Sequence, residues 1–329
     1  AIMDSTLGTI REEIRKNREG NIPTLNIKKY NKARKWMTKR DFTFSKYVEL
    51  CEKMLNSDYE LLTVEKYLTM KNKSEKFIIM RHDVDDGADL PYTLAMARKE
   101  ADSGISATYY FRVNDDVFKP EIIREIASLG HEIGYHYDVL GKADGDYERA
   151  IKLFEHELNM LRAFYDVKTI AMHGGPFVTG LNAATLSDIL KVVKNIIGGK
   201  KTFVNFDSRD LWKIYNFENY GIIGDAYLSI NFNDVVYVSD TNRSWSDTKH
   251  RLRDFIRNNN LNITIRSTDN LIRIIEKGIF PKILILTHPP NWQDGFKDWV
   301  KWLMIQKIKN TGKTCLKMYW KAQDDEKKW

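Results

Sequence analysis

Apolar and polar positions along the central part of the chain follow two alternating patterns. Short apolar runs typical of buried strands occur at residues 59–62, 77–83, 107–111, 131–136 and 169–172. Apolar residues at helical spacing fill most of the intervals, at residues 44–55, 88–103, 120–129 and 147–165. Strands that alternate with helices in this way predict an α/β fold with a parallel sheet or barrel.

The second half of the chain is less regular. We interpret residues 173–235 as long loops with short elements, followed by predicted strands at 235–238, 263–265 and 283–286. A helix at 269–277 begins at a cap supplied by Ser267 or Thr268. A closing helix spans 293–309, and we expect the Lys-rich tail after Gly312 to fray. The predicted divisions are a basic helical N-terminal extension at 1–41, a barrel domain at 42–310 and a C-terminal tail at 311–329.

The composition, 43% hydrophobic and 12% aromatic over 329 residues, fits a soluble globular protein. No apolar run approaches the ~20 residues of a membrane span. The first residues also lack the basic and apolar parts of a signal peptide, so we expect a cytoplasmic protein without a membrane partner. The chain has two cysteines, Cys51 and Cys315, which are too few for a disulfide framework or a cysteine-based zinc site. A single disulfide between the two is an alternative that the sequence leaves open.

The net charge of +7 is moderate for this length and favours anionic partners only weakly. Much of the basic surplus lies in residues 1–40, where Tyr30 and Trp36 are interleaved. Such a stretch is compatible with nucleic-acid binding. We favour a solvated helical arm, because nothing else in the chain indicates a nucleic-acid partner.

Ionisable side chains stand at or just beyond the ends of four predicted strands. They are Asp83 with Asp85, His136 with Asp138, His173, and His288. In a barrel these strand ends share one mouth, so groups far apart in sequence can meet. Two imidazoles and a carboxylate are a ligand set for a catalytic Zn²⁺ or a similar divalent ion. A single histidine is more often structural, and Asp85 or Asp86 can simply cap the next helix; the recurrence at four strand ends favours a site.

Three motifs resemble those of the NodB-homology polysaccharide deacetylases. Gly130 followed by H-E-I-G-Y-H at residues 131–136 is similar to that family's G-H-E-I-G-x-H motif. H-D-V-D at 82–85 resembles its first motif, and L-T-H at 286–288 resembles its last. The resemblance covers residues 42–302 in motif order. It implies a distorted (β/α) barrel of about seven strands with helices outside, and hydrolysis of N-acetyl or O-acetyl groups on a saccharide substrate.

The resemblance also implies roles for individual residues. Asp83 would be the general base, Asp85 and His136 metal ligands, and His288 the general acid. A metal ion, which we expect to be Zn²⁺, polarises the acyl oxygen and lowers the pKa of bound water. Asp83 would take the proton of that water, and a protonated His288 would give one to the leaving amine. Backbone N–H groups near Tyr137 or in the loop at Pro176 are candidates for oxyanion stabilisation.

One position departs from the family pattern. The family usually carries a second histidine four residues after its metal-binding histidine, and this chain has Leu140 there. Leucine cannot bind a metal, so either the third ligand comes from elsewhere or the metal site is lost. We favour His173, which lies near the place of the arginine in the family's arginine and proline motif, over Asp138.

The remaining polar and aromatic candidates each have a structural alternative. His82 orients Asp83 or packs beneath the mouth, His131 is expected to be structural, and His156 and His250 to be solvated. Six charged residues would either line the mouth of the barrel and bind a charged substrate or form surface ion pairs. We favour surface ion pairs for all six: Arg81, Arg112, Asp207, Arg209, Asp240 and Arg243. Three tryptophans fall in predicted loops, where they would either stack against sugar rings or fasten the loops onto the barrel: Trp212, Trp245 and Trp292.

The leading hypothesis from the sequence is therefore a cytoplasmic, metal-dependent hydrolase that removes an acetyl group from a saccharide. A small or nucleotide-linked saccharide in surface-glycan synthesis is the favoured substrate. The alternative is a carbohydrate-binding or scaffolding protein that keeps the barrel without turnover, and Leu140 is the residue that motivates it.

Overall fold

The computed structural model describes residues 40–174, 206–245 and 264–326, and the fold is given for these residues. Apart from Arg40 and Asp41 they belong to the compact unit Phe42–Trp329. The basic positions before Arg40, the loop at Pro176 and His250 lie outside the described residues. The predicted N-terminal extension at 1–41 therefore stays a prediction.

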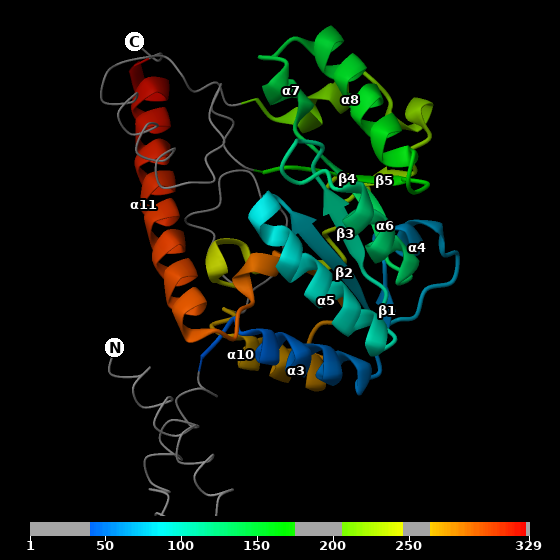
Figure 1. The fold of residues 1–329 in the computed structure, drawn as a ribbon, viewed down its shortest axis with the longest axis vertical. Coiled ribbons are helices and arrows are strands. Elements are labelled where there is room, and N and C mark those ends of the chain that lie inside the picture. The colour runs from blue at the N-terminus through cyan, green and yellow to red at the C-terminus, as the bar shows by residue number, and fades with distance from the viewer. Residues whose placement is uncertain (1–39, 175–205, 246–263, 327–329) are drawn as a thin grey trace, which may run out of the picture. The chain divides into compact units, whose positions relative to one another are not determined.

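Eight strands form one parallel sheet. They are β1 (Glu60–Leu62), β2 (Phe77–Val84), β3 (Thr108–Phe111), β4 (Glu132–Tyr137), β5 (Thr169–Met172), β6 (Gly224–Asp225), β7 (Val236–Ser239) and β8 (Lys282–Thr287). Seven of them follow the order β6-β5-β4-β3-β2-β8-β7, and β1 pairs with the first part of β2. The sheet curls into a half-barrel with flanking helices (Figure 1), which confirms the predicted distorted barrel. Within the described residues β6 and β7 do not pair, so the curl is open between them.

Strand β2 organises the sheet and is buried along all eight residues. It pairs with β8 through residues 77–82 and with β3 through residues 81–84. Because alternate side chains of a strand point to opposite faces of the sheet, His82 points to one face of β2, and Arg81 and Asp83 point to the other. His82 contacts Glu100 of the flanking helix α5 (Leu90–Asp102). Arg81 and Asp83 therefore point into the half-barrel.

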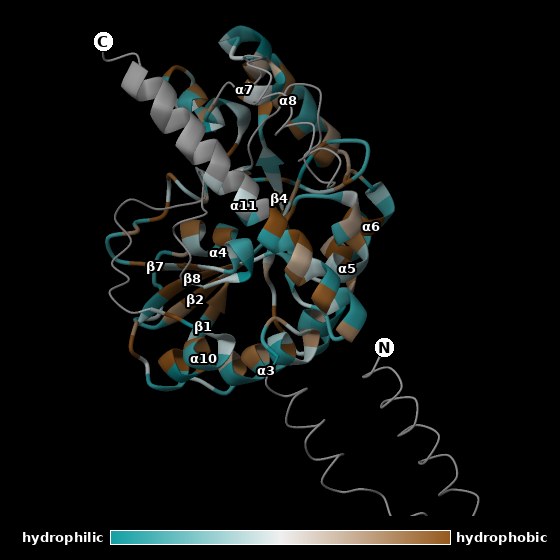
Figure 2. Ribbon diagram, turned by 90° about the vertical axis from the view of Figure 1, so that its left-hand side faces the viewer, coloured by the Kyte–Doolittle hydropathy of each residue, from teal (hydrophilic) through white to brown (hydrophobic). Residues whose placement is uncertain are grey.

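Helices precede the first strand, connect the strands and follow the last one. Besides α5 they are α3 (Phe44–Leu55), α4 (Val64–Thr69), α6 (Pro120–Ser128), α7 (Val139–Lys142), α8 (Tyr147–Arg162), α10 (Thr268–Glu276) and α11 (Phe296–Glu326). Short 3₁₀ turns are η1 (Gly87–Asp89), η2 (Ser208–Lys213), η3 (Phe217–Tyr220), η4 (Thr241–Arg243) and η5 (Pro289–Asn291). Apolar residues gather on β2 and β8, whereas the helices carry mixed polarity (Figure 2).

Side-chain caps explain where several helices begin. The side chains of Thr43, Thr63, Asp146 and Ser267 accept hydrogen bonds from backbone N–H groups in the first turns of α3, α4, α8 and α10. Ser267 is thus the cap of the helix for which the sequence left two choices. The turn after β2 carries a capping box between Asp86 and Asp89, which leaves Asp85 available for another role.

Two predicted elements are wrong. The closing helix does not end at 309 but runs as α11 through Gly312 to Glu326, across the predicted domain boundary at 310/311. A glycine inside a helix lowers helix stability by only about 1 kcal/mol. The neighbouring threonines fit the helix because their hydroxyl groups form hydrogen bonds with backbone carbonyls. The hydroxyl groups of Thr311 and Thr314 each donate to a carbonyl four residues earlier, at 3.0 Å. The described part of the predicted strand 263–265 is not a strand; Ile265 is buried in a loop instead.

Two histidines beneath the sheet are structural. His82 Nδ1 lies 2.6 Å from Thr287 Oγ1, and its Nε2 lies 2.8 Å from Glu100 Oε1. His131 Nε2 lies 2.9 Å from the carbonyl oxygen of Ala97. Burial would raise the pKa of Glu100, but His82 holds that pKa below its ordinary value. His82 therefore packs beneath the mouth rather than orienting Asp83, and the structural role predicted for His131 is confirmed.

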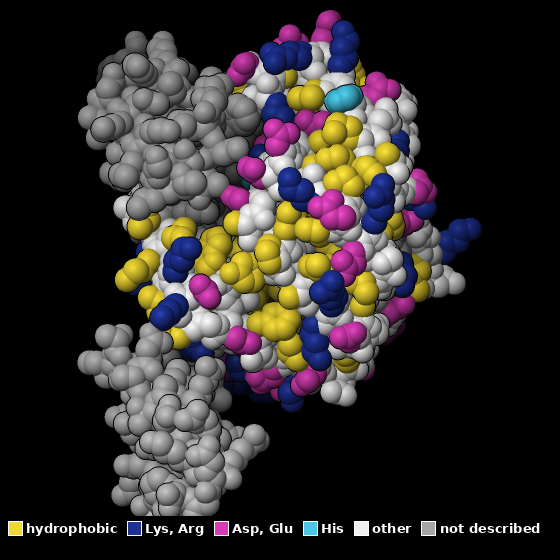
Figure 3. All heavy atoms as spheres, in the orientation of Figure 1, with side chains coloured by type: hydrophobic (Ala, Val, Ile, Leu, Met, Phe, Trp, Pro, Cys, Tyr) yellow, Lys and Arg dark blue, Asp and Glu magenta, His cyan; other side chains and the backbone are white. Residues whose placement is uncertain are grey.

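The outer surface mixes charges of both signs. On the face shown in Figure 3, acidic, basic and apolar side chains intermingle over α5, α6 and α8, without an extended field of one sign. Along the described part of the chain, no helix combines the length and apolar character that crossing a bilayer requires. The cellular location stays a prediction.

Candidate metal centre

The ionisable residues predicted at the strand ends meet at the carboxyl edge of the sheet. Asp83 lies one residue before the end of β2 and Asp85 follows the strand, His136 lies on β4, His173 follows β5 and His288 follows β8. Asp85 is the common neighbour. Its Oδ1 lies 3.2 Å from His136 Nε2 and 3.7 Å from His173 Nε2, and its Oδ2 lies 3.8 Å from His288 Nε2.

Three of these residues fit a metal ion. One ligand atom from each of Asp85, His136 and His173 lies within 4.8 Å of the other two. Oδ1 of Asp85 is buried and has no hydrogen-bond partner among the described residues. A buried oxygen without a partner needs a physical reason, and a cation held between this oxygen and the two imidazole nitrogens supplies one. Ligand atoms about 2 Å from a tetrahedral zinc are roughly 3.3 Å apart, close to the separations of 3.2 and 3.7 Å at Asp85.

The hydrogen bonds of both imidazoles direct Nε2 toward Asp85. His136 Nδ1 lies 2.9 Å from the carbonyl oxygen of Ala171. A carbonyl only accepts, so Nδ1 carries the proton and the neutral ring keeps a lone pair on Nε2. His173 Nδ1 lies 3.4 Å from Asp138 Oδ2. Burial, assisted by the positive charge of Arg112, lowers the pKa of His173, which favours the neutral form that binds metals.

Asp138, the other residue considered as third ligand, lies behind His173. Its Oδ2 accepts a hydrogen bond of 2.8 Å from Arg112 Nη2. Burial would raise the pKa of Asp138, but Arg112 holds it well below the ordinary range. Arg112 Nη1 also donates to the backbone oxygen of Asp85, at 3.1 Å. The geometry thus gives Asp138 and Arg112 the task of orienting His173 and Asp85, and it favours His173 as the third ligand.

Leu140 contributes nothing to the centre. It lies on α7, is 1% exposed and packs in the apolar core. Its backbone N–H donates to Ser208 Oγ at 3.0 Å, which ties α7 to η2. In this chain the position is part of the core.

The carboxylate of Asp83 is held by a buried arginine, Arg81. Arg81 Nε and Nη2 donate to the two oxygens of Asp83, each at 2.8 Å. Arg81 is fully buried, its guanidinium lies 4.4 Å from the centre of the Tyr227 ring, and it donates to the Tyr227 hydroxyl at 3.1 Å. Its interpretation as a surface ion pair is wrong. The signal was present, because Arg81 and Asp83 are two residues apart on one strand and share a face.

His288 is paired with the buried carboxylate of Asp240. His288 Nδ1 lies 2.7 Å from Asp240 Oδ1, and the His288 backbone N–H donates to the same carboxylate at 3.0 Å. Trp292 Nε1 donates to Asp240 Oδ2 at 2.9 Å. Burial acts to lower the pKa of His288, but the buried Asp240 carboxylate, with smaller contributions from Asp85 and Asp83, raises it to about 10. Asp240 is therefore no surface ion pair, and it keeps His288 protonated at neutral pH.

The other candidates are mainly structural. Trp245 and Trp292 are each 1% exposed, so they fasten loops and cannot stack on a sugar from solvent. Trp212 is half-buried and donates to the Tyr137 hydroxyl at 2.7 Å. Arg209 pairs with Asp207 in a partly exposed ion pair, as predicted. Arg243 is buried and donates to the Trp299 carbonyl oxygen, and His156 is exposed, as predicted.

Fold and site together define an α/β half-barrel with a candidate metal centre at the carboxyl edge of its parallel sheet. No protein-family model matches the chain, and no curated protein matches it. Solved structures with a similar fold include a CE4 family pseudoenzyme from Bacillus anthracis, with 15% identity over 72% of this chain and 62% of that chain and a TM-score of 0.33.

Two further similar structures are enzymes. A family 4 carbohydrate esterase from Bacillus anthracis shows 11% identity over 71% of this chain and 76% of that chain, with a TM-score of 0.31. A peptidoglycan deacetylase from Bacillus subtilis shows 17% identity over 74% of this chain and 96% of that chain, with a TM-score of 0.26. The chain spans less than two thirds of the length of the pseudoenzyme. Similarity at these scores does not assign an activity.

Proposed function

We propose that this protein is a metal-dependent hydrolase that removes an acyl group, foremost acetyl, from an amino sugar or another saccharide. The observation that carries the proposal is the convergence of Asp85, His136 and His173. Oδ1 of Asp85 is buried and lies 3.2 Å from His136 Nε2 and 3.7 Å from His173 Nε2. Asp83 and His288 stand beside this group, as an acid and base pair for acyl transfer would.

Asp85, His136 and His173 would hold the ion. We propose Zn²⁺, because two imidazoles and one carboxylate form a catalytic zinc set that leaves a position open. When bound, such an ion polarises the acyl oxygen and lowers the pKa of a water molecule. The contacts of Arg112 and Asp138 fix the orientation of the donors beforehand.

Asp83 is the proposed general base. Its Oδ2 lies 3.5 Å from His136 Nε2, next to the proposed ligands. The bidentate contact with Arg81 uses one lone pair on each oxygen of Asp83. A second lone pair remains on each oxygen, so Arg81 fixes the carboxylate in place while leaving it able to accept a proton.

His288 is the proposed general acid. Its Nδ1 is bonded to Asp240, and its Nε2 faces Asp85. Because Asp240 keeps the ring protonated, Nε2 carries a proton that it can give to a leaving amine or alcohol. We retain the proposal of a small or nucleotide-linked saccharide of surface-glycan synthesis as the substrate, in the cytoplasm.

Metal analysis together with turnover tests the proposal. The purified protein should retain about one divalent ion per chain and release acetate from N-acetylglucosamine oligomers or their O-acetylated counterparts. His136→Ala should lose both properties, whereas His156→Ala, which removes an exposed histidine on α8, should lose neither. A wild-type protein that holds no ion, with no difference between the two variants, would refute the proposal.

A second candidate function is carbohydrate binding or scaffolding without turnover. It is favoured by Leu140, which removes a metal donor of the family pattern and is built into the core. The two functions separate in one experiment on zinc-loaded protein. Saccharide binding by calorimetry without release of acetate would support the binding protein, and release of acetate that depends on Asp83 would support the hydrolase.

A further inference from the structure

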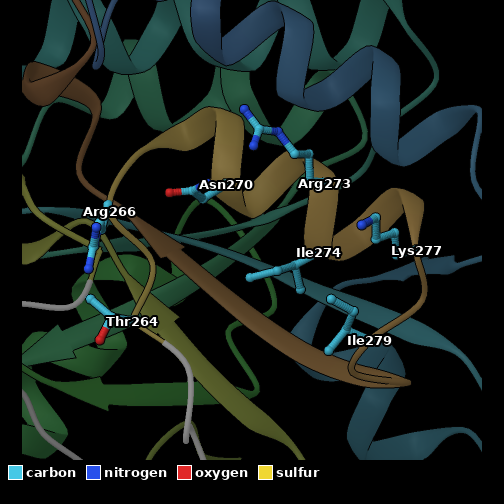
Figure 4. Close-up of a pocket in the computed structure, with 7 residues that line it drawn as sticks. All are labelled: Thr264, Arg266, Asn270, Arg273, Ile274, Lys277 and Ile279. Carbon is cyan, nitrogen blue, oxygen red and sulfur yellow. The ribbon is translucent and has the colours of Figure 1, made fainter.

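A pocket of about 540 Å³ lies along α10 and shares no residue with the candidate metal centre. In Figure 4, Thr264 and Arg266 precede the helix, Asn270, Arg273 and Ile274 lie on it, Lys277 caps its end, and Ile279 follows. The volume is within the range of small-ligand sites. What distinguishes this pocket is the charge of its lining.

Three cations line the pocket. In the ranges that the structure describes, no ion pair involves Arg266, Arg273 or Lys277, and all three are exposed. The acids of α10 are engaged elsewhere. Asp269 pairs with Lys46 at 2.8 Å and Glu276 pairs with Lys53 at 2.7 Å, both on the neighbouring helix α3. The positive charge of the pocket is therefore left unneutralised by its own helix.

The spacing concentrates this charge on one side of α10. Asn270, Arg273 and Lys277 follow each other at intervals of three and four residues, which places them on one helix face. Arg273 and Lys277 are one turn apart, about 6 Å along the axis. Like charges at this spacing destabilise a helix by a few tenths of a kcal/mol, and a bound anion would remove that cost.

The rest of the lining is neutral. Thr264 and Asn270 provide uncharged hydrogen-bonding groups, and Ile274 and Ile279 provide an apolar wall. Ile279 is 43% exposed, which is large for an isoleucine beside a pocket. A ligand with an apolar or ring-shaped part would cover it.

We propose that this pocket binds a diphosphate ester, that is, two linked phosphate groups attached to an apolar or ring-shaped part. Three cations that line one pocket match the roughly three negative charges of a diphosphate, whereas a single carboxylate would leave two cations uncompensated. Arginine forms paired hydrogen bonds with phosphate oxygens, and lysine adds a point charge. This assignment does not depend on the proposed hydrolase function.

Calorimetric titration with inorganic pyrophosphate at low salt tests the phosphate part. Wild-type protein should show saturable binding, and R273A/K277A should bind at least tenfold more weakly. The matched control is R149A/K152A, which removes two exposed basic residues from α8 and should leave the affinity unchanged. Absence of saturable binding at millimolar pyrophosphate, or an equal loss in both double variants, would overturn the proposal.

Two further measurements separate charge from folding and test the apolar part. R273K/K277R keeps both charges and still provides one guanidinium and one ammonium group, so it should retain the affinity within about threefold; a tenfold loss would overturn the electrostatic basis. A nucleoside diphosphate should bind more tightly than pyrophosphate, and Ile279→Ser should reduce that advantage without weakening pyrophosphate. Equal affinities of the two ligands in wild-type protein would overturn the assignment of an apolar part to the ligand.

Discussion

Replacing Asp240 by asparagine removes the charge that keeps His288 protonated. The amide is nearly the same size as the carboxylate and can still accept from Trp292, so the change acts mainly on charge. In the wild-type protein the pKa of His288 is raised to about 10, against an ordinary value of 6.5 in the unfolded chain. A raised pKa in the folded state stabilises the protein fully below pH 6.5, and this contribution is lost as the pH rises through about 10.

The size of the effect follows from the same two values. The gap between 6.5 and about 10, at about 1.4 kcal/mol for each pH unit, corresponds to at most about 5 kcal/mol. The wild-type free energy of unfolding should exceed that of Asp240→Asn by a few kcal/mol at pH 6. The difference should shrink steadily between pH 6.5 and 10 and nearly disappear above that range.

Urea unfolding of both proteins between pH 6 and 10, with metal removed by a chelator, measures this difference. Other titrating groups affect both proteins alike, so the difference isolates the pair of Asp240 and His288. A free-energy difference that stays constant across the pH range would show that Asp240 does not raise the pKa of His288. The role of His288 as a general acid at neutral pH would then lose its physical basis.

Three further changes test other parts of the structure. Arg81→Leu leaves the buried Asp83 without its partner and should lower the free energy of unfolding in urea by about 3–5 kcal/mol. Arg81→Lys should have an intermediate effect, and equal stability of Arg81→Leu and wild type would contradict the buried pair. Gly134→Ala places a methyl group 2.2 Å from the Tyr110 ring and should cost about 1–3 kcal/mol in thermal unfolding, a loss that should be smaller in a Tyr110→Leu background. His173→Ala should abolish metal binding, whereas Asp138→Asn should weaken it about 10–100-fold; the reverse order in metal titrations would make Asp138 the ligand.

The strands were predictable from the sequence because parallel strands buried on both faces read as short apolar runs. The residues at or just after the ends of β2, β4, β5 and β8 were predictable as a group for a topological reason, since the carboxyl ends of parallel strands lie at one edge. Their assembly around Asp85 followed from that topology. The third ligand was harder, because His173 and Asp138 both lie at this edge and only their contacts distinguish them.

The partners of the candidate acid and base were not predicted. A charged residue in a sequence looks the same whether it ends on the surface or in a buried pair, and surface pairs are common. Asp240 meets His288 across 48 residues, which no local pattern reveals. Arg81 was within reach, because its spacing from Asp83 fixes a common face. The role of the tryptophans was likewise not predictable from the sequence. It is their burial in the structure that identifies Trp245 and Trp292 as residues that fasten loops.

The metal centre can be tested most directly by X-ray absorption at the zinc edge on protein loaded with one equivalent of Zn²⁺. We predict a single bound ion with two imidazole nitrogens and oxygen ligands in its shell, and loss of the imidazole contribution on replacing His136 and His173 together. Zinc that does not remain bound, or a coordination shell that the double replacement leaves unchanged, would contradict a metal centre at Asp85, His136 and His173.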